Sequence, residues 1–479
     1  MCEIKEPRLL SIAACEEGLR FAKSRMKSLR HSHKHLRKDH LRARFIEHTA
    51  KGHTDKAAGV KSKITQEEDK KMWFFIRRTT RDAVRKAILE VDAFDENGVK
   101  VRYNTKEEVE NAIQRECEVR FQLAHDAPIN NTLLAEELKY LSDSEVAAKI
   151  FLGTYEIPDD LDNATARILE EIGKVGMKMV LSGGKEIVIT SDDFRTYWKR
   201  VKENTSSSAS GLHYGHYKAA VHSDMLSKVL AQHITIITRS GVPPERWSVA
   251  LQVMLEKIAG TILVSKLRSI QLYEADFNFF NKFVFGRLAQ QRLEESGFLP
   301  EEHYSQKQST AEDATFDKTL TTDISRMMRW AMVLMCIDAA QCYDRVCHVI
   351  MGLMWYALLR NDSAISIALH CLSTMQFHQR TGFGDSVSFF GGPLLTIPFC
   401  GLGQGSGGAP ASWIQLSSMI VNAYTNLGFG AKIPHPTTRM ILTSIGCLFV
   451  DDTDLFVMDP SLSKQELWSF AQESAEAWG

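Results

Sequence analysis

Two apolar segments that end in aspartate constrain this chain more than any other feature. The first covers Met332–Asp338, and the second covers Leu448–Val457 and contains an acidic turn. Two apolar runs around such a turn are typical of a β-hairpin. Strands that deliver carboxylates to one edge of a sheet can bind Mg²⁺ through oxygen ligands, so we predict that Asp338 and Asp451 are metal ligands and that Asp452 lies beside them. Taken alone, an aspartate after a strand is usually a turn residue, so this prediction depends on a further segment.

A glycine-rich segment lies between the two aspartate segments. It covers Gly401–Pro410 and precedes a helix that should begin near Ala411. Glycine lets the backbone approach a base or a sugar closely, and the side chain of Gln404 both donates and accepts hydrogen bonds. Pro410 suits the first turn of a helix. A structural turn is the alternative interpretation, and the position between the two aspartate segments argues against it.

In this order the three segments resemble the sequence motifs of reverse transcriptases, in particular those of non-LTR retrotransposons. Asp338–Asp344 resembles motif A, Gln404–Pro410 resembles motif B, and Phe449–Asp452 resembles the F/Y-x-D-D of motif C. The resemblance covers roughly residues 193–478. It implies an RNA-templated DNA polymerase that adds dNTPs to the 3′-hydroxyl of a DNA or RNA primer. The three aspartates named above would be catalytic, with two Mg²⁺ ions about 3.5–4 Å apart.

The same resemblance implies how the nucleotide is bound. Lys257 and Arg268 are similar to fingers residues that grip the incoming triphosphate, and both side chains suit phosphate. Gln404 and Gly405 would contact the dNTP. Tyr343 lies where the family places an aromatic ring beneath the sugar, and a ring there would collide with a ribose 2′-hydroxyl. An ordinary core tyrosine is the alternative for Tyr343.

A helix is expected just before the first aspartate segment. Ser309 and Glu312 have the spacing of a capping box, and the helix should run toward Arg329. Ser309–Ala314 resembles the helix start that precedes motif A in retrotransposon enzymes. The glycine- and arginine-rich lead-in of those enzymes is replaced here by Tyr304–Gln308, so the template contact of that lead-in is not implied.

We expect an α+β fold with the fingers and palm of a right-hand polymerase, in which helices back an antiparallel palm sheet. Residues 1–190 are predicted to form a mostly helical extension, residues 191–330 a fingers-like region, and residues 331–479 an incomplete palm without a thumb. The extension contains Lys23–Arg44, where nine Lys or Arg stand against one acid. A helix that contacts phosphates and a solvated charged face are both open interpretations of this stretch.

The last segment predicts an amphipathic helix. Leu467, Phe470, Ala471, Ala475 and Trp478 fall on one of its faces. We expect this apolar stripe to lack a partner, because the family continues at about this point toward a thumb. The expectation is a truncated element that synthesises DNA weakly.

Composition restricts the class of protein further. No apolar run approaches the ~20 residues of a membrane helix, and the N-terminus lacks the apolar region of a signal peptide. The nine cysteines include no CxxC pair, which disfavours a zinc ribbon or a redox motif. We expect a soluble, intracellular protein with no membrane partner, and the oligomeric state stays open.

Two other functions stay open. An RNA-dependent RNA polymerase uses similar chemistry, but that family tends to carry a second aspartate where this chain has Tyr343. An inactive reverse-transcriptase remnant would act only as a nucleic-acid-binding protein. The choice between dNTPs and rNTPs separates the first alternative from a reverse transcriptase, and Mg²⁺-dependent primer extension separates the second.

Overall fold

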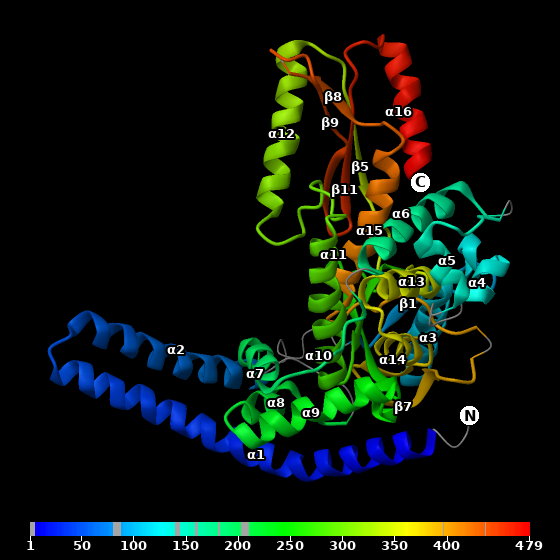
Figure 1. Ribbon diagram of the computed structural model, residues 1–479. Helices are drawn as coiled ribbons and strands as arrows, with labels where there is room; N and C mark the ends of the chain where they lie inside the picture. The colour runs from blue at the N-terminus through cyan, green and yellow to red at the C-terminus, as the bar shows by residue number, and fades with distance from the viewer. Residues whose placement is uncertain are drawn as a thin grey trace. The chain divides into compact units, whose positions relative to one another are not determined.

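The computed structural model describes most of the chain as a mixed α+β protein with many helices and several small sheets, which confirms the predicted class (Figure 1). The described residues are 5–79, 88–138, 144–158, 161–180, 183–202, 210–395, 397–435 and 437–479, with only part of the side chains in the first two helices.

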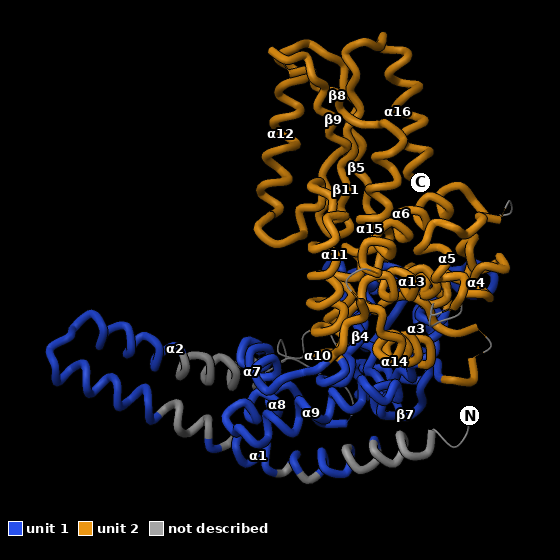
Figure 2. Tube along the Cα trace, viewed as in Figure 1, with its two compact units in different colours: residues 1–118, 188–277, 375–392 blue, residues 119–187, 278–374, 393–479 orange. Residues whose placement is uncertain are grey.

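The chain forms two compact units, each built from separate stretches (Figure 2). Unit 1 comprises Met1–Glu118, Val188–Phe277 and Met375–Gly392, and unit 2 comprises Val119–Ile187, Asn278–Thr374 and Pro393–Gly479. The division into three consecutive domains stays a prediction.

Unit 1 combines helices with a four-stranded sheet and a small hairpin. Its elements are α1 (Lys5–Ala50), α2 (Thr54–Thr79), β1 (Val91–Phe94), β2 (Lys100–Tyr103), most of α3 (Lys106–Gln122), α7 (Ser191–Arg200), α8 (Tyr214–Ala220), α9 (Asp224–Ser240), η4 (Glu245–Ser248), β3 (Val249–Glu256), η5 (Val264–Lys266), β4 (Leu267–Leu272), the start of α10 (Ala275–Phe283), β6 (Gln376–Thr381) and β7 (Gly384–Gly391). The sheet has the order β4-β3-β6-β7, with β3 and β6 parallel and the other pairs antiparallel.

The hairpin of β1 and β2 lies among the helices of the N-terminal region, which is predicted to be mostly helical. Its loop contains Asn97-Gly98, a strong signal for a hairpin, and Gly98 has a φ of 73°. Inside the hairpin, buried Asp92 pairs with Lys100 at 2.9 Å and with Arg102 at 2.8 Å. Because the two strands are short and contain charged residues, the composition of this region resembles that of a helix and does not predict the hairpin.

The predicted basic stretch lies in α1, so its helical state agrees with the expectation. Met26, which lies in this stretch, is fully buried. The side chains of His33 and Leu36, also in this stretch, lie outside the described residues. Arg42 and Arg44 are exposed, which is compatible with both interpretations of the stretch.

Unit 2 contains both aspartate segments and the glycine-rich segment. Its elements are the end of α3, η2 (Leu123–Asp126), η3 (Pro128–Asn131), α4 (Leu133–Leu138), α5 (Glu145–Leu152), α6 (Asn163–Val180), the rest of α10, the π-helical η6 (Val284–Ala289), α11 (Gln290–Ser296), α12 (Ala311–Met328), β5 (Val333–Asp338), α13 (His348–Leu359), α14 (Asp362–Ser373), α15 (Ala409–Thr425), β8 (Ala431–Pro434), β9 (Ile441–Ser444), β10 (Gly446–Phe449), β11 (Asp452–Val457) and α16 (Lys464–Trp478). Within the part of the chain that the structure describes, no helix is long and apolar enough to cross a membrane.

A three-stranded antiparallel sheet of order β10-β11-β5 lies between α12 and α16 (Figure 1). Because side chains alternate along a strand, one face packs against α16 and the other against α12. Met335 and Ile337 face α16, where Phe470 and Trp478 join the same apolar cluster. The expectation that the stripe on the last helix lacks a partner is therefore wrong, because the stripe covers this sheet.

The helix before β5 ends where the sequence predicts but begins one residue later in its capping pattern. Thr310, rather than Ser309, is the N-cap: its hydroxyl accepts the N–H of Asp313 at 3.3 Å, and Asp313 accepts the N–H of Thr310 at 2.8 Å. Thr310 has the extended backbone that an N-cap needs. Arg329 closes the helix as a left-handed C-cap, which confirms the predicted end.

Candidate active site

The predicted hairpin is present and brings the aspartates of both segments to one end of the three-stranded sheet. β11 pairs with β5 in a register that places Asp452 directly opposite Asp338. The N–H of Ala339 donates to the backbone oxygen of Asp451 at 3.1 Å, which ties the turn to the end of β5. Asp338 and Asp452 are exposed and Asp451 is half-buried. The three predicted carboxylates therefore share one edge, which we call the acidic edge.

The turn that carries Asp451 has an unusual backbone. Phe449 and Asp452 are paired across the hairpin, so Val450 and Asp451 are its two central residues. Val450 has a φ of 58°, and a left-handed conformation is a genuine outlier for a β-branched residue. A positive φ at the first central position is typical of a type II′ turn, where glycine is usual.

Two side chains from elsewhere in unit 2 hold this turn in place. The N–H of Val450 donates to Ser305 Oγ at 2.6 Å, and Trp413 Nε1 donates to the oxygen of Val450 at 2.7 Å. Ser305 lies before α12 and Trp413 lies on α15, so both contacts are distant in sequence. Backbone strain persists when the surroundings fix it in this way. The placement of Asp451 thus depends on the fold of the whole unit.

The glycine-rich segment packs directly on the chain that follows Asp338. The N–H of Leu402 donates to the oxygen of Tyr343 at 2.7 Å, and the N–H of Gly401 donates to the oxygen of Val346 at 2.9 Å. Gly401 has a φ of 83°, and a Cβ there would lie 2.8 Å from the backbone of Asp344. Glycine is required here both by the conformation and by the close approach.

The rest of the glycine-rich segment leads into α15. Asn278 holds it: its side chain accepts the N–H of Gly407 and donates to the oxygen of Gly405 at 3.2 Å. Gly405 is exposed with a φ of 143°, and Gln404 is half-buried. Pro410 occupies the first turn of α15, as predicted. The predicted nucleotide-binding residues of this segment are thus accessible in the same unit as the acidic edge.

Tyr343 lies within the electrostatic reach of the acidic edge. Burial raises the pKa of its phenol to about 12, and the nearby Cys342 and Asp451 add to the rise. Burial likewise raises the pKa of the Cys342 thiol to about 12, and the charge of Asp451 contributes. Tyr343 is half-buried. The phenol is uncharged at neutral pH, so Tyr343 presents a neutral ring within electrostatic reach of Asp451.

Asp344 is a site residue to which sequence reasoning gave no role. Its side chain is 5 % exposed, and burial raises its pKa to about 6 while the charge of Arg120 opposes the rise. Asp344 Oδ1 has no hydrogen-bond partner among the described residues. An aspartate after an aromatic residue gives no local signal of burial, because the burial comes from the glycine-rich segment that covers it.

Lys257 and Arg268 belong to unit 1, whereas the acidic edge belongs to unit 2. Lys257 follows β3 and Arg268 lies on β4, and both side chains are exposed. In the register of this pair, Glu256 lies opposite Leu267, so the two cations lie at the same end of the β3–β4 hairpin. The two predicted phosphate-binding cations thus lie together within their unit.

The donor set of the acidic edge fits Mg²⁺ only as a pair of carboxylates. Within the described ranges, no three His, Cys, Asp or Glu side chains gather closely enough to hold a metal ion. Mg²⁺ in polymerase sites is commonly bound by one or two carboxylates together with substrate phosphates and water. Asp338 and Asp451, which the strand register and the hydrogen bond from Ala339 bring to one edge, are the candidate pair.

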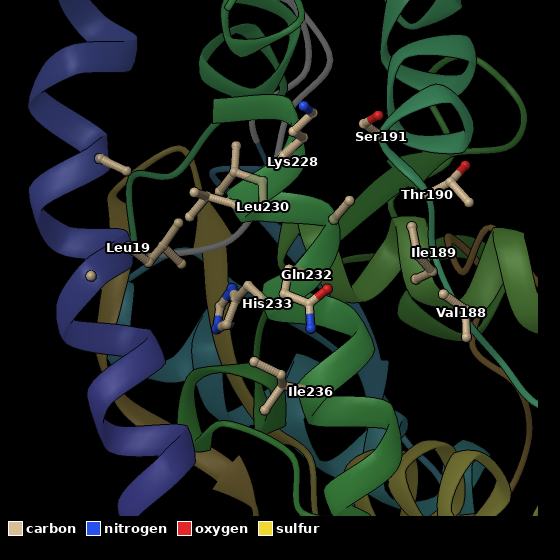
Figure 3. Close-up of a pocket in the computed structure, with 14 residues that line it drawn as sticks. Leu19, Val188, Ile189, Thr190, Ser191, Lys228, Leu230, Gln232, His233 and Ile236 are labelled. Carbon is tan, nitrogen blue, oxygen red and sulfur yellow. The ribbon is translucent and has the colours of Figure 1, made fainter. Parts of the chain in front are cut away.

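Unit 1 contains an apolar cavity. It has a volume of about 790 Å³ and lies between α1, α9 and the stretch Val188–Ser191 (Figure 3). Apolar side chains such as Leu19 and Ile236 form most of its wall, with His233 and Lys228 as charged or titratable members. None of the predicted site residues lines it. The cavity is therefore not part of the predicted catalytic or nucleotide-binding site.

Comparison with known proteins gives only a distant likeness. No family model matches the chain, and no curated protein matches it. Among solved structures, a telomerase from Candida albicans in complex with a fragment of telomeric RNA is similar with a TM-score of 0.32 and 10% sequence identity. The match covers 76% of this chain and 70% of that chain. Similarity this low does not indicate an activity. The function is therefore inferred from the residues of the acidic edge.

Proposed function

We propose that this chain is a reverse transcriptase that extends a DNA or RNA primer with dNTPs on an RNA template. The observation that carries the proposal is the register of β5 and β11, which sets Asp338 opposite Asp452 with Asp451 in the adjoining turn. Strands from two distant segments would have no structural reason to place three like charges at one edge, because like charges on neighbouring strands destabilise a sheet. A bound cation provides such a reason.

In this proposal Asp338 and Asp451 bind a pair of Mg²⁺ ions, and Asp452 adds negative charge beside them. When bound, the ions would lower the pKa of the primer hydroxyl and stabilise the leaving pyrophosphate. The protein's own contribution is to fix the two carboxylates before substrate arrives. The hydrogen bond from Ala339 to Asp451 and the contacts that hold Val450 supply that rigidity.

The sugar of the incoming nucleotide would lie against Tyr343. The ring is half-buried near Asp451, and the hydrogen bond from Leu402 fixes the backbone at this position. A fixed aromatic ring excludes a 2′-hydroxyl by contact, which favours dNTPs over rNTPs. Gln404 and Gly405 would contact the base or the sugar from the glycine-rich segment, since both are accessible.

Lys257 and Arg268 would neutralise the triphosphate. Both are exposed at one end of the same hairpin, where an ammonium and a guanidinium suit phosphate oxygens.

Primer extension on primed RNA and DNA templates, with dNTPs and with rNTPs, tests the proposal. We expect Mg²⁺-dependent addition of dNTPs on RNA, and Tyr343→Val should raise the kcat/KM for rNTPs relative to dNTPs, measured as a difference in transition-state free energy. A preference for rNTPs in the unmodified chain would identify an RNA-dependent RNA polymerase. Nucleic-acid binding without any extension would identify an inactive remnant.

A further inference from the structure

Lys318 on α12 reaches the sheet beside the acidic edge. Its Nζ donates to Asp454 Oδ2 at 2.8 Å and lies 3.8 Å from Cys336 Sγ. Asp454 on β11 and Cys336 on β5 are direct cross-strand partners. The ammonium group therefore lies over one pair of the ladder, with a carboxylate on one strand and a thiol on the other.

This pair is the next one along the sheet from the acidic edge on the same face. Asp454 lies two residues after Asp452, and Cys336 lies two residues before Asp338, so all four side chains point to the same side. Successive same-face positions on a strand are roughly 7 Å apart. The carboxylate of Asp454 is thus the nearest further acid on the face that carries Asp338 and Asp452.

The ion pair is partly shielded from solvent. The side chains of Lys318 and Asp454 are 33% and 27% exposed. The neighbouring acid on the same helix, Asp317, accepts a hydrogen bond from the hydroxyl of Tyr304. Lys318 pairs with Asp454 and compensates its charge.

We propose that Lys318 is a positioning residue, which keeps Asp454 from acting as a metal ligand beside Asp452. The inference rests on the proposed function, because it assumes that cations bind at Asp338 and Asp451. Without the ammonium group, Asp452 and Asp454 would present two free carboxylates on one strand face. Such a pair can bind a divalent cation away from the position where the turn places Asp451.

Direct binding of Mn²⁺ to the full chain, followed by electron paramagnetic resonance without nucleotide or nucleic acid, tests this inference. We expect Lys318→Met to bind Mn²⁺ roughly tenfold more tightly, since it leaves one carboxylate charge uncompensated near the edge. Lys318→Arg should bind like the unmodified chain, and Asp454→Asn should abolish the gain in the Lys318→Met background. Lys318→Gln gives a second variant that can still hydrogen-bond Asp454 if Lys318→Met unfolds.

Lys432→Met is the matched control. Lys432 pairs with Asp459 at 2.9 Å beyond the other end of β11, and its side chain is about as exposed as that of Lys318. It should leave Mn²⁺ binding unchanged. Equal Mn²⁺ affinity in Lys318→Met and the unmodified chain, or an equal gain in the Asp454→Asn background, would overturn the inference. Failure of the proposed function has a separate signature, because Mn²⁺ binding would then survive Asp338→Asn and Asp451→Asn.

Discussion

Two hairpin turns in this molecule reach a positive φ by different means. In the β1–β2 hairpin, Gly98 takes the positive φ, and Asp95 Oδ1 accepts the N–H groups of Asn97 at 2.9 Å and Val99 at 2.8 Å. These contacts are local in the sequence. In the β10–β11 hairpin, Val450 takes the positive φ without the freedom of glycine.

The second turn is defined by the rest of its unit. Ser305 and Trp413, both far from Val450 in the chain, hold its two backbone polar groups. A strained conformation of this kind costs about 1–3 kcal/mol and is retained where the surroundings impose it. The comparison indicates that local contacts fix the β1–β2 turn, whereas contacts from distant parts of unit 2 fix the β10–β11 turn and with it the backbone of Asp451.

The largest expected effect comes from a glycine that remote contacts enclose. Gly401→Ala would place a Cβ 2.8 Å from the backbone of Asp344 at a φ of 83°, so we expect a loss of roughly 3–4 kcal/mol of unfolding free energy. Gly98→Ala, which meets open space, should cost about 1 kcal/mol through its positive φ alone. Urea unfolding followed by circular dichroism measures both. Equal losses of unfolding free energy in the two variants would show that the close packing around Gly401 adds nothing to the cost of the positive φ.

A second prediction concerns the acid beneath the glycine-rich segment. The pKa of Asp344 is raised to about 6 in the folded protein, so the folded state binds more protons than the unfolded state between pH 4 and pH 6. Its contribution to stability is therefore present at low pH and is lost as the pH rises through about 6. We expect this loss to amount to roughly 2–3 kcal/mol.

Urea unfolding at several pH values measures this contribution. Asp344→Asn should flatten the decrease between pH 4 and pH 7, because the side chain no longer ionises. Asp95→Asn, in the locally defined turn, should leave the decrease in place. A decrease that persists in Asp344→Asn would mean that another group causes it.

The smallest effect on stability is expected at the strained turn itself. Val450→Gly relieves the left-handed strain but adds backbone freedom, so the unfolding free energy should change by less than about 1 kcal/mol. Primer extension should nevertheless slow roughly tenfold to a hundredfold, because Asp451 loses its fixed position. Thermal unfolding and single-turnover extension on the same preparation separate the two quantities. Unchanged extension would mean that the strain has no role in placing Asp451.

The elements that the sequence predicts well are those with local signals. The hairpin around Asp451 follows from two apolar runs and an acidic turn, and the end of α12 at Arg329 follows from a helical pattern. The capping residue of α12 was wrong by one position, because Ser309 and Thr310 are both good caps and only the backbone distinguishes them. The partner of the last helix was missed because the sheet face that it covers is built from distant strands.

The candidate site was predictable in its residues but not in its contacts. Asp338 follows from the end of an apolar strand and Asp451 from an acidic turn, yet the register that brings them to one edge depends on pairing between segments far apart in the chain. The burial of Asp344 and the ion pair of Lys318 with Asp454 arise from tertiary packing, for which the sequence has no periodic signal. Residues of this kind become visible only when the fold is known.

Removal of one carboxylate from the acidic edge tests the central claim most directly. Asp338→Asn and Asp451→Asn each remove an anionic ligand while keeping the size of the side chain, so extension of a primed RNA template with dNTPs and Mg²⁺ should fall below detection. Asp323→Asn, a change at an exposed position of α12 in the same unit, should leave extension intact. Circular dichroism should be unchanged in all three variants. Extension at nearly the unmodified rate by either Asp338→Asn or Asp451→Asn would contradict the account.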